Sequence, residues 1–466
     1  MIEKTPTVMR IAVGFFMFSL DLAGKVCYNN TEIILRSNFM NIQKIVEDLR
    51  GCPCGREHTV DIRAVEIGKN MTGRTGEILE QNGFPKNILL VADDTTLRVS
   101  DGILESLESR GFKLKKLIYP DLKLARAEEV AEVEALCSDV EGILSVGTGS
   151  LNDICRAAAR RIGREFAIFA TAPSMDGFGS DTAPILRNNF KETWPGVQPS
   201  VIIADTAILA ASPTELKAAG LGDMIAKYVA ITDWRVSTLL TGEYFCENIE
   251  KLTLDAVNKC VALAPRLAGC DEEAAGAVME ALVMSGIAMK FAGCSRPASG
   301  AEHMVSHFLE CYKCVNGIWP DYHGKKVGVA SLLISGAYRR IAKEVESVTA
   351  GEDPLELASL LSLFDPAFHS EIAALNTSPI TDIVDPRVLE QRWSRVRSTV
   401  LNYIPEPETL LAAMKAAEGV TDIRGIHVSP ELMRDALHGH AHMRHRIYLS
   451  RLLPMLGIDI VDYVDI

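Results

Sequence analysis

Three histidines and one aspartate form a pattern that is typical of a catalytic metal site. His303 and His307 stand four residues apart, so a helix would place both on one face. His323 follows a short loop, and Asp223 opens an Ala- and Lys-containing stretch earlier in the chain. Two imidazoles and a carboxylate leave one position open on a divalent metal, as catalysis requires. The alternative is a set of ordinary core or surface histidines, and the spacing alone does not identify the reaction.

The sequence also contains two polar turns that could bind phosphate groups. Residues 146–153 read Val-Gly-Thr-Gly-Ser-Leu-Asn-Asp and stand between an apolar run and a helical pattern. Glycines let a ligand approach the backbone, and free N–H groups at a helix start bind phosphate oxygens. Asn152 stands at the third glycine position, so the turn is not the G-x-G-x-x-G fingerprint. Residues 171–180 follow the next apolar run, so the two turns predict a nucleotide pyrophosphate site; turns without a ligand are the alternative.

Three further clusters of cysteine and histidine have simpler interpretations. Cys52, Cys54 and His58 could bind zinc, but a fourth ligand is missing, so free thiols in a β segment are favoured. The Cys-x-x-Cys motif at residues 311–314 has no second pair and is interpreted as two buried or idle thiols. Residues 438–445 contain four histidines. In a helix they would lie on different faces, which favours a solvated helix surface over a metal site.

Short apolar runs alternate with helical patterns between residues 60 and 205. The expected strands are residues 88–92, 114–119, 142–146, 166–170 and 201–204, and the expected helices are residues 96–110, 125–137 and 151–162. This alternation predicts a parallel sheet with helices on both faces. The two polar turns would then lie at the carboxyl ends of strands, where ligands bind in such sheets.

The pattern changes after Pro213. Apolar residues recur three and four apart in Ala- and Leu-rich windows, and strand-like runs nearly vanish. The clearest windows are residues 215–234, 274–291, 327–345 and 410–417. We therefore expect a Rossmann-like α/β domain followed by an all-α domain. The expected divisions are an extension of uncertain status at residues 1–39, a nucleotide-binding domain at residues 40–208, and a helical metal- and substrate-binding domain at residues 209–466.

Composition excludes several classes of protein. The chain has 466 residues, of which 48% are hydrophobic, and its formal charge is −13. This composition is globular, and the acidic balance argues against nucleic acid as a partner. Eleven scattered cysteines fit free thiols in a reducing compartment, so we expect a cytoplasmic protein. The apolar run at residues 11–20 is too short to span a bilayer, so no stable membrane insertion is expected, and an extension or tail is favoured over a signal or anchor.

Together, these motifs resemble one enzyme family. Residues 295–307, Ser-Arg-Pro-Ala-Ser-Gly-Ala-Glu-His-Met-Val-Ser-His, form the most specific block, and residues 323–327, His-Gly-Lys-Lys-Val, follow it. With the glycine turn, the Thr-x-x-Ser-x-Asp-Gly motif and the Gly-Asp pair, they are similar in order and spacing to the sn-glycerol-1-phosphate dehydrogenases. That family belongs to the iron-containing alcohol dehydrogenase and glycerol dehydrogenase superfamily, which has a dehydroquinate-synthase-like fold. The resemblance covers residues 40–455.

The resemblance implies a role for each matching residue. Asp223, His303 and His323 would hold one divalent metal, zinc in the first instance, with nickel or iron as alternatives. Asp176, Asp223 and His307 would contact the substrate, with Asp223 and His307 as the catalytic groups. The NAD or NADP cofactor would be bound by Gly147, Thr148, Gly149, Ser150, Leu151, Thr171, Ser174 and Ser180.

The implied reaction is the reduction of dihydroxyacetone phosphate to sn-glycerol 1-phosphate, a lipid head-group precursor, and its reverse. The metal would polarise the carbonyl oxygen while reduced nicotinamide delivers hydride, and His307 would relay the proton. Asp93 and Asp94 would repel a 2′-phosphate, which favours NAD over NADP. The substrate phosphate needs cationic partners. The candidates near the motifs are Lys227, Arg296, Lys325 and Lys326.

Three alternatives stay open. A glycerol or other polyol dehydrogenase of the same superfamily would act on an unphosphorylated substrate, a dehydroquinate-synthase-like cyclase would recycle its NAD, and a binding protein would have lost catalysis. The sequence lacks the cluster of Lys and Arg expected for the cyclase, and it keeps all three implied metal ligands. A homo-oligomer is the expected assembly.

Overall fold

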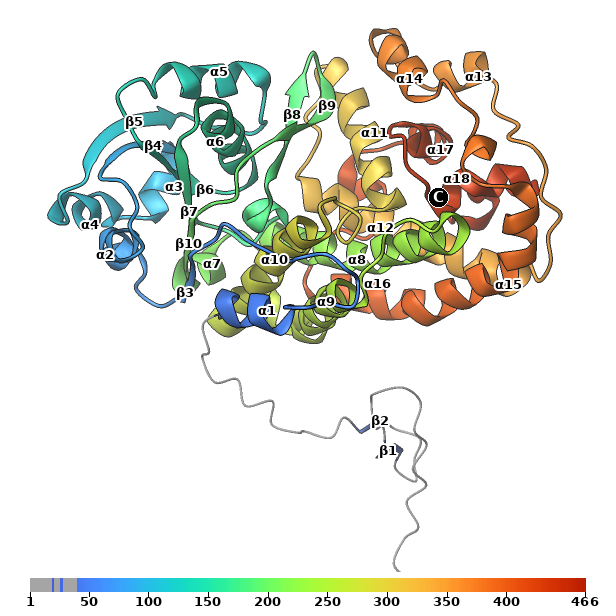
Figure 1. The fold of residues 1–466 in the computed structure, drawn as a ribbon, viewed down its shortest axis with the longest axis horizontal. Helices are drawn as coiled ribbons and strands as arrows, with labels where there is room; N and C mark the ends of the chain where they lie inside the picture. Colours follow the sequence, from blue (N-terminus) through green and yellow to red (C-terminus); the bar gives the residue numbers. More distant parts are fainter. Residues whose placement is uncertain (1–18, 21–25, 28–39) are drawn as a thin grey trace, which may run out of the picture. The chain divides into compact units, whose positions relative to one another are not determined.

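A six-stranded parallel sheet organises the first half of the chain (Figure 1). Its strands are β3 (Ala64–Gly68), β4 (Asn87–Asp93), β5 (Lys113–Tyr119), β6 (Gly142–Gly147), β7 (Glu165–Ala170) and β10 (Val201–Asp205), in the spatial order β3-β10-β7-β6-β4-β5. All neighbouring pairs run parallel. β4, β6 and β7 are almost wholly buried, which explains why they read as continuous apolar runs. The predicted parallel sheet is confirmed; β3 was not predicted.

The strand order reverses direction at β4 and β6. From β4 the chain moves outward to its neighbour β5, and it then returns to the other side of β4 to form β6. Such a switch point leaves a crevice beyond the carboxyl ends of the two strands, because the connecting segments diverge to opposite sides. Asp93 ends β4 and Gly147 ends β6, so the first polar turn lies at this crevice.

α1 (Ile42–Asp48) precedes the sheet, and further helices connect its strands. The connecting helices are α2 (Thr75–Gln81), α3 (Asp94–Val99), α4 (Ile103–Ser109), α5 (Ala127–Ala135) and α6 (Gly149–Ile162). The helix predicted at residues 96–110 is two helices, because Gly102 adopts a left-handed conformation with φ of 89° between α3 and α4. α2 packs on α4, and α5 packs on α6.

An antiparallel hairpin that was not predicted lies between β7 and β10. It consists of β8 (Thr182–Arg187) and β9 (Phe190–Pro195). Asn188 and Asn189 connect the strands with φ of 52° and 61°, as in the two-residue turns that match the twist of a hairpin. The hairpin extends from the α/β half towards the helical half, where β9 contacts α11.

The second half of the chain is helical, as the windows after Pro213 predict. Its helices are α7 (Thr206–Ala211), α8 (Thr214–Thr241), α9 (Glu247–Leu267), α10 (Glu272–Ala292), α11 (Ala301–Val315), α12 (His323–Glu344), α13 (Leu357–Leu361), α14 (His369–Leu375), α15 (Pro386–Tyr403), α16 (Pro407–Ala416), α17 (Pro430–Gly439) and α18 (Leu449–Leu452). α8 is nearly buried throughout and packs against α9, α11, α12 and α15. It is the central helix of this half.

α10 joins the two halves. Gly286 on α10 lies against Gly179, and a Cβ on Gly286 would come within 2.7 Å of the Gly179 backbone. By length and composition α10 is also long and apolar enough to cross a membrane, but 78% of its most apolar window is buried inside the protein. It packs against α7, α8 and α9, so here it is a core helix.

The computed structural model describes Ser19–Leu20, Val26–Cys27 and residues 40–466. Contacts divide the chain into residues 1–41 and a compact unit formed by residues 42–466. In the first unit, the two-residue strands β1 (Ser19–Leu20) and β2 (Val26–Cys27) pair antiparallel. Apart from these strands, the expectations for the apolar run at 11–20 and for the extension at 1–39 lie outside the described residues.

Candidate functional site

A cavity of about 740 Å³ opens at the carboxyl ends of β4 and β6 and continues to α11 and α12. Among the residues singled out in the sequence, those that line it are Asp93, Thr148, Gly149, Ser150, Leu151, Thr171, Ser174, Asp176, Ser180, His303, His307, His323 and Lys326. Gly147 and Asp223 are fully buried and are not part of this lining. The two polar turns and the histidines therefore meet at one cavity.

The glycine turn places the start of α6 at the cavity. Thr148 precedes the helix in an extended conformation and makes no side-chain cap, so the first N–H groups of the helix are left for other acceptors. Gly147 has a steric role, because a Cβ there would lie 2.3 Å from Leu151 Cδ1. The arrangement suits an anionic ligand such as a pyrophosphate.

Three helices bring Asp223, His303 and His323 together; we call these residues the Asp–His cluster. Asp223 lies on α8, His303 on α11, and His323 begins α12. Their ligand atoms lie within 4.8 Å of one another, with 3.3 Å between Asp223 Oδ1 and His303 Nε2. His323 Nδ1 is buried and has no hydrogen-bond partner. One carboxylate and two imidazoles, one of which has an unpartnered ring nitrogen, fit a divalent metal that keeps one coordination position open.

Glu302 orients His303, a role that was not predicted although the two residues are neighbours in the motif. The carboxylate oxygen Oε1 lies 2.7 Å from His303 Nδ1 and accepts the Gly300 N–H at 2.8 Å. A carboxylate on the second ring nitrogen fixes the ring and makes the other nitrogen a better ligand.

The pKa values of His303 and His323 reflect the charges that surround the Asp–His cluster. Burial lowers the pKa of His303, but its contacts with Asp223 and Glu302 outweigh burial and raise that pKa to about 9. Burial and the charge of Lys191 lower the pKa of His323 to about 3. A proton on His303 offsets the negative charges of Asp223 and Glu302. A divalent metal ion would offset the same charges while both imidazoles are neutral.

Asp176 and Asp223 are linked through Lys227. The Lys227 ammonium lies 2.6 Å from Asp176 Oδ2 and 3.3 Å from Asp223 Oδ1, and it donates to the Ala298 carbonyl at 3.1 Å. Ser285 Oγ also donates to Asp176 Oδ2 at 3.0 Å. The predicted substrate residue Asp176 is thus held firmly at the cavity wall beside the Asp–His cluster.

The four cations considered for the substrate phosphate differ in their ion-pair partners and in whether they line the cavity. Lys227 is committed to the two aspartates, Arg296 pairs with Glu243, and Lys325 pairs with Glu215 and Asp321. Of the four, only Lys326 lines the cavity.

Lys191 and Arg444, which line the same cavity as Lys326, were missed in the sequence, and so was Lys123, which lines the cavity and pairs with Asp121. Lys191 comes from the hairpin and lies 2.9 Å from both Glu310 oxygens, while Lys326 lies 3.2 Å from Glu310 Oε2. Arg444 donates to Thr193 Oγ1 at 2.7 Å. Lys191 and Lys326 share the one carboxylate of Glu310, and Arg444 adds a further positive charge to the cavity lining.

His307 faces these cations. It is buried, and burial together with the charges of Lys191 and Arg444 holds its pKa well below the ordinary value. Its ring centre lies 6.4 Å from that of His303 and 6.1 Å from that of His323. A neutral imidazole therefore stands beside the Asp–His cluster at neutral pH.

The interpretation of the histidine tract at 438–445 was wrong in part. His440 and His442 are buried, because the chain leaves α17 through a tight 3₁₀ turn that directs both side chains inward. His440 Nε2 lies 2.8 Å from Ser450 Oγ, and His442 Nδ1 lies 2.9 Å from Asn376 Oδ1. His438 is exposed and pairs with Asp459. The buried histidines are core residues with hydrogen-bond partners.

The cysteines also differ from expectation in one place. Cys311 and Cys314 are buried free thiols, as predicted. Residues 52–58, however, form no strand, and the structure places Cys246 beside Cys52, Cys54 and His58 as the fourth ligand that the local sequence lacks.

Comparison with known sequences identifies the family. The profile of the iron-containing alcohol dehydrogenase family matches residues 66–213. A glycerol-1-phosphate dehydrogenase (NAD(P)+) from Halalkalibacterium halodurans is 34% identical over 312 residues, which cover 65% of this chain and 78% of the relative. The chain belongs to the glycerol-1-phosphate dehydrogenase family. Relatives of the same name include those from Geobacillus stearothermophilus, 27% identical over 91% of this chain and 99% of the relative, and Pyrococcus furiosus, 31% identical over 63% and 85%.

Solved structures share the fold at low sequence identity. NADH-dependent butanol dehydrogenase A from Thermotoga maritima has a TM-score of 0.58 at 14% identity, covering 86% of this chain and 96% of that one. Sulfoacetaldehyde reductase from Bifidobacterium kashiwanohense, in complex with NAD+, has a TM-score of 0.57 at 14% identity, covering 87% and 98%. The fold class expected from the sequence is confirmed.

Proposed function

We propose that the protein catalyses the metal-dependent, NAD(P)H-linked reduction of dihydroxyacetone phosphate to sn-glycerol 1-phosphate, and its reverse. The observation that carries this proposal is the single cavity, which is lined by the glycine turn, two histidines of the Asp–His cluster and the cations Lys191, Lys326 and Arg444. The lining offers groups suited to a dinucleotide, to a metal ion that would polarise a carbonyl, and to a phosphate. Membership of the glycerol-1-phosphate dehydrogenase family supports the same reaction.

The dinucleotide would lie across the switch point. Gly147 to Leu151 and the start of α6 would hold the pyrophosphate, and Thr171, Ser174 and Ser180 would contact the rest of the cofactor. Asp93 lines the cavity at the end of β4, where it disfavours a 2′-phosphate and favours NAD. A bound reduced nicotinamide supplies the hydride.

Asp223, His303 and His323 would hold one divalent metal, with zinc as the proposed ion and nickel or iron as alternatives. A bound metal supplies a Lewis acid for the substrate carbonyl. The protein's part is to fix the ligands: Glu302 holds the His303 ring, and the Asp176 N–H donates to Asp223 Oδ2 at 2.9 Å. Asp223 and His303 are buried, and His323 is half-buried where it lines the cavity.

Lys191, Lys326 and Arg444 would bind the phosphate, since a dianion needs several charge-assisted hydrogen bonds. Asp176 would contact a substrate hydroxyl, and His307 would hold the reacting oxygen and move its proton. A phosphate bound nearby offsets the cations that lower the pKa of His307 and so brings that pKa nearer to neutrality, where proton transfer is most efficient.

The decisive experiment follows NADH and NADPH oxidation with dihydroxyacetone phosphate and with dihydroxyacetone, before and after chelation and metal repletion. We expect metal-dependent turnover that selects the phosphorylated ketone and gives the sn-1 phosphate. Turnover with dihydroxyacetone alone would move the protein to the polyol dehydrogenases, and turnover with neither ketone would refute the proposed reaction.

A further inference from the structure

A second cluster of metal-ligating side chains lies away from the cavity. Cys52, Cys54 and His58 from the irregular segment before β3 meet Cys246 at the start of α9, and we call these four residues the cysteine–histidine cluster. One ligand atom from each lies within 4.8 Å of all the others. None of the four lines the cavity, and the proposed reaction uses none of them.

The distances within this cluster match a tetrahedral metal site. Cys52 Sγ lies 3.6 Å from Cys246 Sγ, and His58 Nε2 lies 3.2 Å from Cys54 Sγ and 3.8 Å from Cys246 Sγ. Zinc bonds of about 2.3 Å to sulfur and about 2.0 Å to nitrogen place two sulfurs about 3.8 Å apart and a sulfur and nitrogen about 3.5 Å apart. The four ligands therefore surround a space of the right size for one ion.

The neighbours of the ligands orient them as in a built metal site. His58 Nδ1 lies 3.1 Å from the Phe291 carbonyl, which fixes the tautomer that leaves Nε2 free as a ligand. Asn248 Nδ2 donates to Cys52 Sγ at 3.2 Å, and the Tyr244 hydroxyl donates to Cys54 Sγ at 3.4 Å.

We propose that the cysteine–histidine cluster binds a structural zinc ion. Four protein ligands fill a tetrahedral ion completely and leave no position for a substrate, in contrast to the three ligands of the Asp–His cluster. Three thiolates and one imidazole also select a softer metal than a carboxylate-containing site does.

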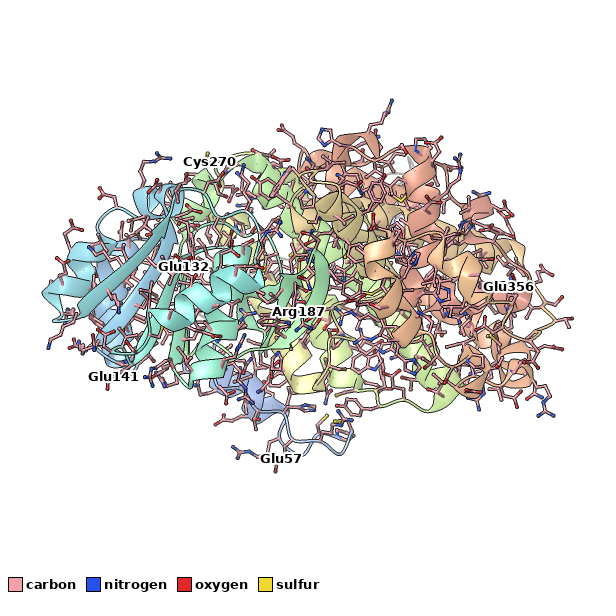
Figure 2. All side chains as sticks on the ribbon, turned by 90° about the horizontal axis from the view of Figure 1, so that it is seen from above. Glu57, Glu132, Glu141, Arg187, Cys270 and Glu356 are labelled. Carbon is pink, nitrogen blue, oxygen red and sulfur yellow. The ribbon has the colours of Figure 1, made fainter. Side chains whose placement is uncertain are left out.

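The ion would fasten the first residues of the compact unit to the helical half. Residues 53–63 form no helix or strand, although the Gly55 N–H donates to the Cys52 carbonyl and the Arg63 N–H donates to the Ser200 carbonyl. Arg56 adds to the attachment: it donates to the Ala292 carbonyl at the end of α10 at 3.0 Å and lies 3.4 Å above the Tyr244 ring. Figure 2 shows Glu57, which belongs to the same segment, at the edge of the molecule. A metal bound by the cysteine–histidine cluster would hold this short surface segment in one conformation.

The test begins with the full-length chain, expressed with zinc and purified under reducing conditions, by counting metal per chain. We expect two ions per chain in the wild type and one in Cys246→Ser, with the ion of the Asp–His cluster retained. Cys270→Ser is the matched control, because Cys270 is exposed and lies on the opposite side of the view in Figure 2 from Glu57; it should keep both ions.

Cobalt substitution of the wild type gives an answer that does not depend on whether a variant folds. Thiolate ligands produce sulfur-to-cobalt charge-transfer absorption, which the oxygen and nitrogen ligands of the Asp–His cluster cannot produce. Absence of these bands, or equal metal content in the wild type and Cys246→Ser, would overturn the proposal. So would a Cys52–Cys246 disulfide in place of the ion, detected as an intact mass two hydrogens short and assigned to this pair by peptide mapping.

Discussion

The described part of the chain contains two clusters of residues that could bind a metal ion, and they differ in donor atoms, number of ligands and surroundings. The Asp–His cluster offers one carboxylate and two imidazoles at a cavity of about 740 Å³. The cysteine–histidine cluster offers three sulfurs and one imidazole outside that cavity. An ion with three protein ligands beside a cavity can accept a substrate oxygen, whereas an ion with four cannot. Access and ligand number would thus distinguish the proposed catalytic site from the proposed structural site.

The clusters also differ in what holds their ligands. The residues of the Asp–His cluster lie on α8, α11 and α12, three packed helices that position the side chains before any ion binds. In the cysteine–histidine cluster, three ligands lie on an irregular segment that the ion itself would order. We therefore expect changes in the first cluster to affect activity and changes in the second to affect stability.

The largest effect should come from His303→Ala. Loss of this ligand removes the Lewis acid, whose several kcal/mol of transition-state stabilisation correspond to about a thousand-fold in kcat/KM. Metal content should fall by one ion per chain, while the cobalt charge-transfer bands persist. His438→Ala, a change at an exposed histidine, is the control and should leave both readouts unchanged. Full turnover in His303→Ala would contradict the assignment of the catalytic metal.

Arg444→Met should separate phosphorylated from free substrates. Hydrogen bonds to a charged group contribute about 1.5–3 kcal/mol, so we expect the KM for dihydroxyacetone phosphate to rise about 10- to 100-fold. Weak turnover of dihydroxyacetone should stay unchanged, because that substrate has no phosphate. Arg446→Met is a nearby control, since Arg446 does not line the cavity. An equal loss with both substrates would assign Arg444 a structural role.

Glu302→Gln should weaken the catalytic metal without removing a ligand. The amide oxygen can still accept the Gly300 N–H, but it lacks the charge that acts on His303. Loss of such a partner lowers metal affinity by about 10- to 100-fold. Competition with a chelator measures this affinity through the return of activity on metal repletion. An unchanged affinity would show that packing alone orients His303.

The smallest effect should come from Asn248→Ala in the second cluster. It removes one N–H donor to Cys52 Sγ, which contributes about 0.5–1.5 kcal/mol and thus up to about tenfold in affinity for the ion. The rate of metal transfer to a coloured chelator should rise, and turnover should match the wild type. A loss of turnover in Asn248→Ala equal to that in Glu302→Gln would contradict the expectation that changes in the cysteine–histidine cluster affect stability and leave activity unchanged.

Sequence patterns predicted the elements whose burial is uniform. β4, β6 and β7 read as apolar runs because both faces are covered, and α8, α10 and α12 show helical spacing. β3 and the hairpin of β8 and β9 were missed because they have only five or six residues each and are only partly buried. The Asn188–Asn189 pair was the available signal for the hairpin, since two adjacent residues with positive φ typify such turns.

Site prediction failed where contacts are distant in the chain. Cys246 lies 194 positions from Cys52, so no local spacing reveals the fourth ligand. Lys191 was missed along with its hairpin. Glu302 could have been found, because an acidic neighbour of an expected ligand is a natural partner for its second nitrogen. The burial of His440 depends on a 3₁₀ turn that helical spacing cannot indicate.

The position of the cysteine–histidine cluster along the chain bears on how the protein is shortened for laboratory use. Three of its ligands precede β3, and the matched family profile begins at residue 66. A chain trimmed to begin at Ala64 would retain the whole Asp–His cluster and every residue lining the cavity, yet it would lack Cys52, Cys54 and His58. A chain whose boundaries are chosen from active-site residues alone would thus keep the proposed catalytic groups but lose three of the four ligands of the proposed structural zinc.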